Sequence, residues 1–223
     1  MASQIPNINI QKNVEQFKKD KNAFSRYASF DYCFNYFQSF RENNTAELAD
    51  DDHIQDSCFQ LGFYLASWGM FRGSSFLLEK SIKYFEDAIR LIARYNSKIW
   101  SVDVDKYTST NMRLLIDFKK GLKDSLAGDR KPSDTLVTKI MLGVFGNTPA
   151  LDRNFRAAFG VGTFNENMLR TISDFYFQNQ TEIDQTVIPT LDFMKGEETA
   201  RKYTKAKIID MVGFIEGSNL GSN

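Results

Sequence analysis

Two stretches of this chain carry polar residues that a plain alternation of core and surface does not explain. In the first, Arg72 lies between Gly69 and Gly73 and is followed by Ser74 and Ser75. An arginine in such a turn can reach an anion, and Ser74 can cap a following helix whose first backbone N–H groups also attract anions. The structural alternative is a tight corner between two helices, for which the glycines alone suffice.

The second stretch runs from Thr138 to Gly160 and brings a lysine and an aspartate close together in the sequence. Lys139 lies in one short helix, Pro149 opens the next, and Asp152 falls in the first turn of that second helix. The Asp152 carboxylate can cap the helix, pair with Lys139 or face a substrate. An aspartate in the first turn of a helix is usually structural. Asp152 and Lys139 are nevertheless the candidate catalytic residues.

Basic side chains provide further candidates for binding nucleic acid or another anion. Arg153 and Arg156 follow Asp152, and a second basic group precedes the apolar stripe of the last predicted helix. That group consists of Arg201, Lys202, Lys205 and Lys207, partly offset by Glu197 and Glu198. Its structural alternative is a solvated basic face.

The composition argues against several classes of function. The chain has 28 basic and 28 acidic residues, so no overall field would draw it to nucleic acid or to an anionic membrane. His53 is the only histidine, and Cys33 and Cys58 lie in apolar helical patterns without a CxxC pair. We therefore predict no metal site, no disulfide and no cofactor. P-loop, dinucleotide-binding, HExxH and GxSxG motifs are absent, which leaves open whether the chain is an enzyme.

Apolar periodicity predicts an all-α fold, a single bundle of about eight to ten helices with no substantial sheet. Tyr27, Phe30, Phe34 and Phe37 form one face of the first predicted helix, and the second is apolar on several sides, which is typical of a central helix. The expected helices cover residues 22–41, 54–70, 81–94, 105–126, 133–145, 150–159, 165 into the 180s, and 197–216.

We expect one domain over residues 1–223, and a subdivision near 127–132, where Gly128 and Pro132 interrupt the pattern, is the alternative. The first 20 residues lack the apolar stretch of a secretory signal. The longest apolar neighbourhood, Cys58 to Met70, is too short to span a bilayer. These features predict a cytoplasmic protein without a membrane partner.

The arrangement of Thr138-Lys139 about a dozen residues before Pro149-x-x-Asp152 resembles a pattern in uncharacterised bacterial helical proteins. The runs FDYCFNYF, LASWGMFRGSSFLL and KIIDM resemble recurring features of the same proteins, so this resemblance spans most of the chain. Residues 138–160 are also remotely similar to the helix that follows the hairpin in helix-hairpin-helix DNA glycosylases. That similarity implies an active-site role for Asp152 and backbone-phosphate contacts for Arg153 and Arg156. The hairpin of that family is replaced here by AGDRKPSD, and Lys139 is not where the family keeps its lyase lysine.

Three functions follow as alternatives. The first is a non-enzymatic helical protein that binds a macromolecule, either nucleic acid or a partner protein, and an exposed groove of aromatic and basic residues would support it. The second is a glycosylase-like DNA-processing enzyme using Asp152, which requires a cleft for a flipped base. The third is a structural bundle that associates with copies of itself, for which the oligomeric state is the test.

Overall fold

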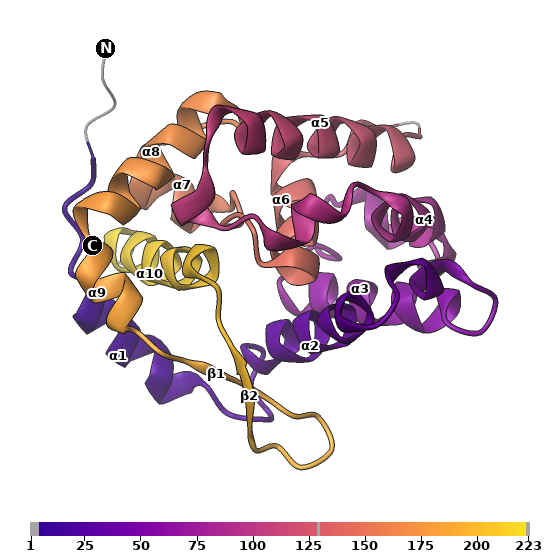
Figure 1. The fold of residues 1–223 in the computed structure, drawn as a ribbon, viewed down its shortest axis with the longest axis horizontal. Helices are drawn as coiled ribbons and strands as arrows, with labels where there is room; N and C mark the ends of the chain where they lie inside the picture. Colours follow the sequence, from indigo (N-terminus) through magenta and orange to yellow (C-terminus); the bar gives the residue numbers. More distant parts are fainter. Residues whose placement is uncertain (1–4, 129, 222–223) are drawn as a thin grey trace.

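Helices dominate the computed structural model, which describes residues 5–128 and 130–221. This part of the chain is 65% helical with ten α-helices and a small two-stranded sheet (Figure 1), which confirms the predicted all-α class. The helices are α1 (Ile10–Asp20), α2 (Ala28–Glu42), α3 (Ile54–Ser67), α4 (Glu86–Arg94), α5 (Ser109–Ser125), α6 (Asp134–Phe145), α7 (Arg153–Phe159), α8 (Glu166–Gln178), α9 (Gln180–Gln185) and α10 (Lys205–Leu220). The strands β1 (Pro189–Leu191) and β2 (Glu198–Lys202) are antiparallel.

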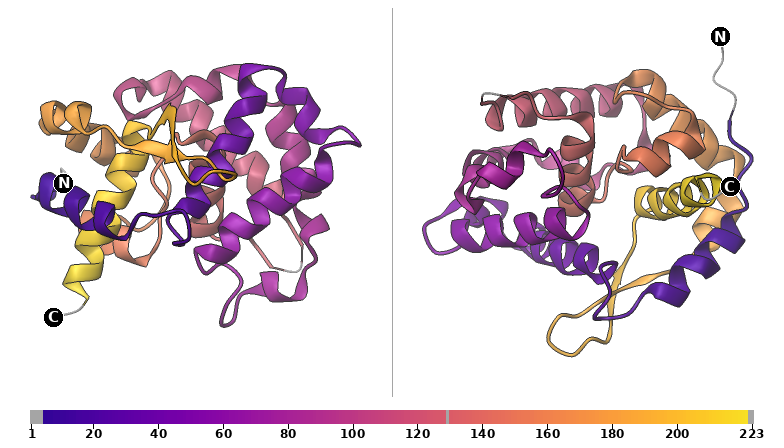
Figure 2. Two further views of the ribbon diagram at one scale, coloured as in Figure 1. Left: turned by 90° about the horizontal axis from the view of Figure 1, so that it is seen from below. Right: turned by 180° about the vertical axis from the view of Figure 1, so that it is seen from behind.

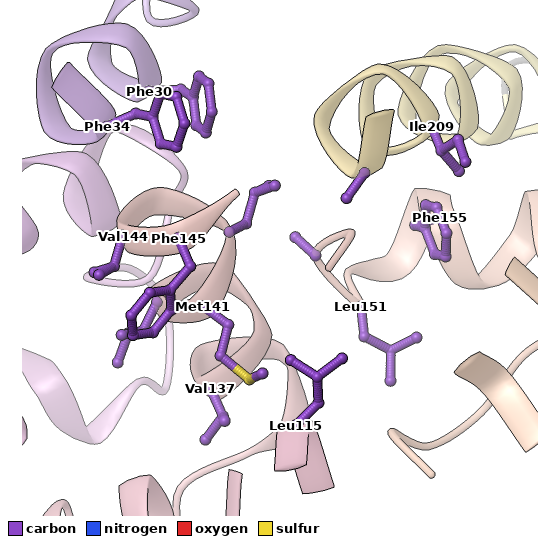
Figure 3. Close-up of a cluster of buried hydrophobic side chains, with 14 of the residues drawn as sticks. Phe30, Phe34, Leu115, Val137, Met141, Val144, Phe145, Leu151, Phe155 and Ile209 are labelled. Carbon is purple, nitrogen blue, oxygen red and sulfur yellow. The ribbon is translucent and has the colours of Figure 1, made fainter. Parts of the chain in front are cut away.

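Helix α6 lies at the centre of the fold, and every residue from Leu136 to Phe145 is buried. Figure 3 shows its side chains among apolar residues from α2 and α5, including Phe30, Phe34 and Leu115. The prediction that residues 54–70 form the central helix is wrong, because α3 leaves Phe59 and Phe63 exposed on one side. Since α6 is enclosed all round, any polar side chain on it must find a partner or a cleft.

The predicted stripe on α2 is confirmed, because Tyr27, Phe30, Phe34 and Phe37 are all buried. Phe30 stacks on Phe34 with ring centroids 5.2 Å apart and meets Tyr64 of α3 edge to face. Contacts of this kind between rings stabilise helix pairs beyond the area they bury. They hold α2 against α3.

The last predicted helix begins later than expected. Residues Glu198–Lys202 form β2, which pairs with β1, and α10 starts only after Thr204, whose Oγ1 accepts a hydrogen bond from the Lys207 N–H. Glu, Ala, Arg and Lys, which make up most of β2, favour helices, and pairing with β1 overrides this preference. The apolar stripe of α10 is buried as predicted.

Helix α10 packs against α1 and α7, which places the C-terminal and N-terminal helices side by side (Figures 1 and 2). Figure 2 shows α10 in front when the molecule is seen from behind. Because α10 packs against α7, it lies close to the N-terminus of that helix, where Asp152 is the N-cap. Within the described residues no helix combines the length and apolar character needed to cross a membrane.

Candidate functional site: a cationic cleft between α3, α6, α7 and α10

The two stretches singled out in the sequence meet at one cleft of about 630 Å³. Its walls come from the turn before α2, the end of α3, the first two turns of α6, the start of α7 and Phe214 of α10. This volume is in the range of small-molecule and cofactor sites. The lining residues are Arg26, Ala66, Ser67, Trp68, Gly69, Met70, Arg72, Thr135, Lys139, Asp152, Arg153, Asn154 and Phe214.

The corner after α3 places Trp68 and Arg72 on the cleft wall. Trp68 ends the helix, and Gly69 follows in the left-handed region with φ of 74°. The left-handed backbone favours glycine here, and the absence of a Cβ atom leaves room for the Arg72 side chain, whose Nε would lie 2.7 Å from one. The predicted corner is therefore present, and anion binding by Arg72 stays a prediction.

Two hydrogen bonds fix the segment that leads into Asp152. The Thr138 Oγ1 accepts a hydrogen bond from the Leu151 N–H at 2.8 Å, and the Asp210 Oδ1 accepts one from the Ala150 N–H at 2.8 Å. The Asp152 Oδ1 then accepts a hydrogen bond from the Phe155 N–H at 3.0 Å and caps α7. The structural role expected of a first-turn aspartate is thus present, but it occupies one carboxylate oxygen only.

The second carboxylate oxygen of Asp152 faces Lys139. The Lys139 Nζ lies 3.5 Å from the Asp152 Oδ2, and the lysine is only 4% exposed. Burial lowers the pKa of Lys139 below its ordinary value, because the enclosed site disfavours the charged amine, and Asp152 opposes this effect only in part. Lys207 lies nearby and is a further positive charge that lowers the Lys139 pKa.

A second buried ion pair lies beneath the first. The Lys207 Nζ is 2.8 Å from the Asp210 Oδ2, and Lys207 is 2% exposed. Its ammonium group also lies over the Phe30 ring at 4.5 Å and the Trp68 ring at 5.5 Å. Lys139 and Asp152 at the floor of the cleft therefore lie next to a second buried lysine and aspartate, and a change in any one charge alters the others.

The mouth of the cleft carries arginines without acidic partners. Arg26, Arg72 and Arg153 are exposed, and none forms an ion pair or a side-chain hydrogen bond with any residue in the described ranges. Asp152 is the one carboxylate among the described lining residues, against three arginines and Lys139. An electrically neutral chain thus presents a locally positive cleft, which attracts anions.

The other predicted anion-binding residues lie away from this cleft. Arg201 pairs with Glu42 at 2.7 Å, and Lys205 pairs with Asp105 at 2.9 Å. Lys202 is exposed on β2, and Lys207 is buried, so the expectation of one solvated basic face over residues 201–207 is wrong. The strand and the helix separate these residues, and acidic neighbours neutralise two of them.

Two further candidates differ from their predicted roles. Ser74 is exposed and caps nothing, because Ser75 precedes the next element, a 3-10 turn over Phe76–Glu79. Arg156 lies behind the cleft wall, where its Nη2 donates to the Thr135 Oγ1 at 3.5 Å. Arg153, which is one turn earlier, is the arginine of this pair that lines the cleft.

Sequence reasoning missed Arg26 and Phe214. Arg26 was placed within a long first helix, but it lies in the turn before α2, and Phe214 lies on α10 beside the predicted apolar stripe. The Arg26 guanidinium carbon lies 5.2 Å from the Trp68 ring centroid and 5.6 Å from that of Phe214. Neither Arg26 nor Phe214 belongs to a recognisable motif, because only the fold brings these two residues to Trp68.

The arrangement can bind an anionic ligand that also carries a flat or apolar group. Phosphate oxygens suit the arginines, the rings of Trp68 and Phe214 provide a stacking surface, and Lys139 and Asp152 provide a proton donor and acceptor at the floor. Among the described residues no group of three or more His, Cys, Asp or Glu side chains gathers as a metal ion would require. No protein-family model matches this sequence, and no curated protein and no solved structure is significantly similar to it.

Proposed function

We propose that this protein binds nucleic acid, with the cationic cleft as its binding site. The observation that supports this most directly is the set of three exposed arginines without acidic partners around an aromatic wall. Nucleic acids present phosphates at regular spacing next to flat bases, and both groups have a counterpart here. Basic residues elsewhere, such as Arg201 and Lys205, are paired with acids and add little attraction.

The test is a fluorescence anisotropy titration with labelled single-stranded and double-stranded DNA and RNA at low salt. The test variant is Arg72→Ala/Arg153→Ala, and the matched control is Arg94→Ala, which removes an exposed arginine from the last turn of α4. Each lost charge-assisted contact should weaken binding by roughly tenfold. We expect the double variant to lose about a hundredfold in affinity and the control to bind like the wild type. Equal affinity of all three proteins would refute the proposal.

A second candidate is glycosylase-like processing of DNA, and the position of Asp152 favours it. One oxygen of Asp152 caps α7 while the carboxylate lines a cleft large enough to admit a single base. In this reading the base enters the cleft, the arginines bind the flanking phosphates and Asp152 is the active-site acid.

This second candidate has its own test. Product formation is followed on duplexes that contain damaged bases, with wild type and with Asp152→Asn, which keeps an acceptor for the helix cap. We expect the variant to bind DNA and to form no product. Product formation at the same rate in both proteins would exclude Asp152 as the active-site acid, and nucleic-acid binding would remain as a separate result.

A further inference from the structure

Trp68 is the most heavily engaged side chain of the cleft. Its ring has three cations within contact distance, with Arg26 and Lys139 each 5.2 Å and Lys207 5.5 Å from the ring centroid. Phe214 meets the same ring edge to face, with the centroids 5.5 Å apart. The indole N–H has no hydrogen-bond partner within the described residues, although it is covered from solvent. A covered donor without an acceptor is uncommon and is a feature that a ligand can satisfy.

Arg26 is the only one of these three cations that is exposed and has no acidic partner in the described chain. Its guanidinium lies over Trp68, Phe214 and Tyr27, at 5.2, 5.6 and 5.6 Å from their centroids. A contact between an exposed cation and an aromatic ring is weak. A paired hydrogen bond from arginine to a phosphate is considerably stronger, so a phosphate at the cleft mouth would draw Arg26 away from the rings.

Removal of Arg26 would uncover an aromatic surface inside a positively charged cleft. Trp68 and Phe214 are both partly exposed and line the cleft wall, and Lys139 with Asp152 lies at its floor. A nucleobase stacks well on tryptophan, and its carbonyl oxygens and ring nitrogens can accept a hydrogen bond from an amine such as that of Lys139. A base that is paired in a duplex has its faces covered by its neighbours and cannot reach this surface.

We propose that Arg26 covers a stacking site for an unpaired nucleobase, and that binding exchanges the guanidinium for the base on the Trp68 ring while Arg26 turns to the adjacent phosphate. This inference rests on the proposed nucleic-acid binding and specifies the ligand as a nucleotide with an unpaired base. Phosphate alone would move Arg26 but would leave the ring without a stacked partner.

The test follows the emission of Trp68 in the Trp100→Phe variant, because Trp68 and Trp100 are the only tryptophans in the chain. The probes are a short single-stranded oligothymidylate and inorganic polyphosphate, which has phosphates but no bases. Binding of each is measured separately, by anisotropy for the labelled oligonucleotide and by competition for polyphosphate. We expect saturating oligothymidylate to reduce Trp68 emission at least twofold and polyphosphate to cause less than a tenth of that change.

The variant Arg26→Ala distinguishes the role of Arg26 as a cover of the Trp68 ring from its role in binding phosphate. We expect this variant to bind oligothymidylate and polyphosphate roughly tenfold more weakly, since one phosphate contact is lost. The quenching at saturation should be at least as large as before, because the stacking site is already open. Arg94→Ala is the matched control and should change neither quantity. If Trp100→Phe unfolds, the same signal is obtained as the difference between wild type and Trp68→Phe.

Each other outcome overturns the inference. Binding of oligothymidylate without quenching would show that no base reaches Trp68, and nucleic-acid binding would still stand. Equal quenching by polyphosphate would assign the signal to movement of Arg26 alone. If Arg26→Ala were saturated with oligothymidylate and showed no quenching, Arg26 would be needed to hold the base on the Trp68 ring and would not be the cover of that ring. Absence of binding by both probes would refute the proposed function and this inference together.

Discussion

The buried pair of Lys139 and Asp152 gives a prediction that separates function from stability. Asp152→Asn keeps an acceptor for the Phe155 N–H and removes the negative charge that lies 3.5 Å from the Lys139 Nζ. Removing one partner of a buried ion pair costs about 3–5 kcal/mol. The variant can avoid the unpaired charge if Lys139 releases its proton. With the ordinary lysine pKa of about 10.4, that release costs about 5 kcal/mol at pH 7 and about 2 kcal/mol at pH 9, which sets an upper limit on the loss of stability at each pH.

The pH dependence follows from the lowered pKa of Lys139. Between its folded and unfolded pKa values the unfolded chain binds more protons than the folded one, so stability rises with pH. Without Asp152 the folded pKa falls further, and the effect extends to lower pH. We therefore expect Asp152→Asn to lose about 3 kcal/mol at pH 7 and less than about 2 kcal/mol at pH 9.

Urea denaturation of the wild type, both single variants and Lys139→Met/Asp152→Asn tests this reasoning. A buried ion pair can often be replaced by uncharged groups at little cost, so the double variant should lie within about 1 kcal/mol of the wild type. A double variant that loses the sum of the two single losses would show that the two side chains contribute independently, and would contradict their pairing. A loss in Asp152→Asn that does not change between pH 7 and 9 would refute the assigned burial of the Lys139 charge.

Two further predictions concern backbone geometry and the cysteines. Gly146 and Gly160 both end helices with φ near 63°, but a Cβ on Gly146 would lie 2.8 Å from the Thr204 Cγ2, whereas nothing lies within 4 Å of one on Gly160. Gly160→Ala should therefore cost about 1 kcal/mol and Gly146→Ala at least about 1 kcal/mol more in thermal unfolding, and equal losses would contradict the close contact. Burial raises the pKa of Cys33, and it raises the pKa of Cys58 to about 11, so neither thiol should react with a disulfide reagent at pH 8 until the chain is denatured. A thiol that reacts rapidly in the native protein would show that its environment is more open than described.

Periodicity predicted the helical parts of the fold well because burial repeats along each helix. The stripe of Phe30, Phe34 and Phe37 is an example, since each of these rings faces the same core. The strand β2 could not be predicted in this way. Its residues alternate between exposed and partly exposed, and its partner β1 is a three-residue segment that begins with Pro189. Pairing between two such segments depends on the turn that joins them and not on a hydrophobic pattern.

The candidate site was predicted in pieces but not as a whole. Arg72 and Asp152 were each singled out by local features, yet nothing in either stretch indicated that both line one cleft. Their approach depends on α3 packing against α6 and on the Thr138–Leu151 hydrogen bond, which holds the segment before α7 to α6. Arg26 and Phe214 lie in ordinary helical or turn sequences, and only the packing of α10 and the turn before α2 brings them to Trp68.

The most direct test of the cleft as a nucleic-acid site is the dependence of its affinity on salt. Each phosphate contact with single-stranded nucleic acid adds about 0.7 to the slope of log K against log salt concentration. Arg26, Arg72 and Arg153 line the cleft mouth without acidic partners in the described chain, so their triple alanine variant should reduce the magnitude of that slope by about 2. Arg94→Ala should leave the slope unchanged. A triple variant with the wild-type slope would contradict the assignment of this cleft as the binding site.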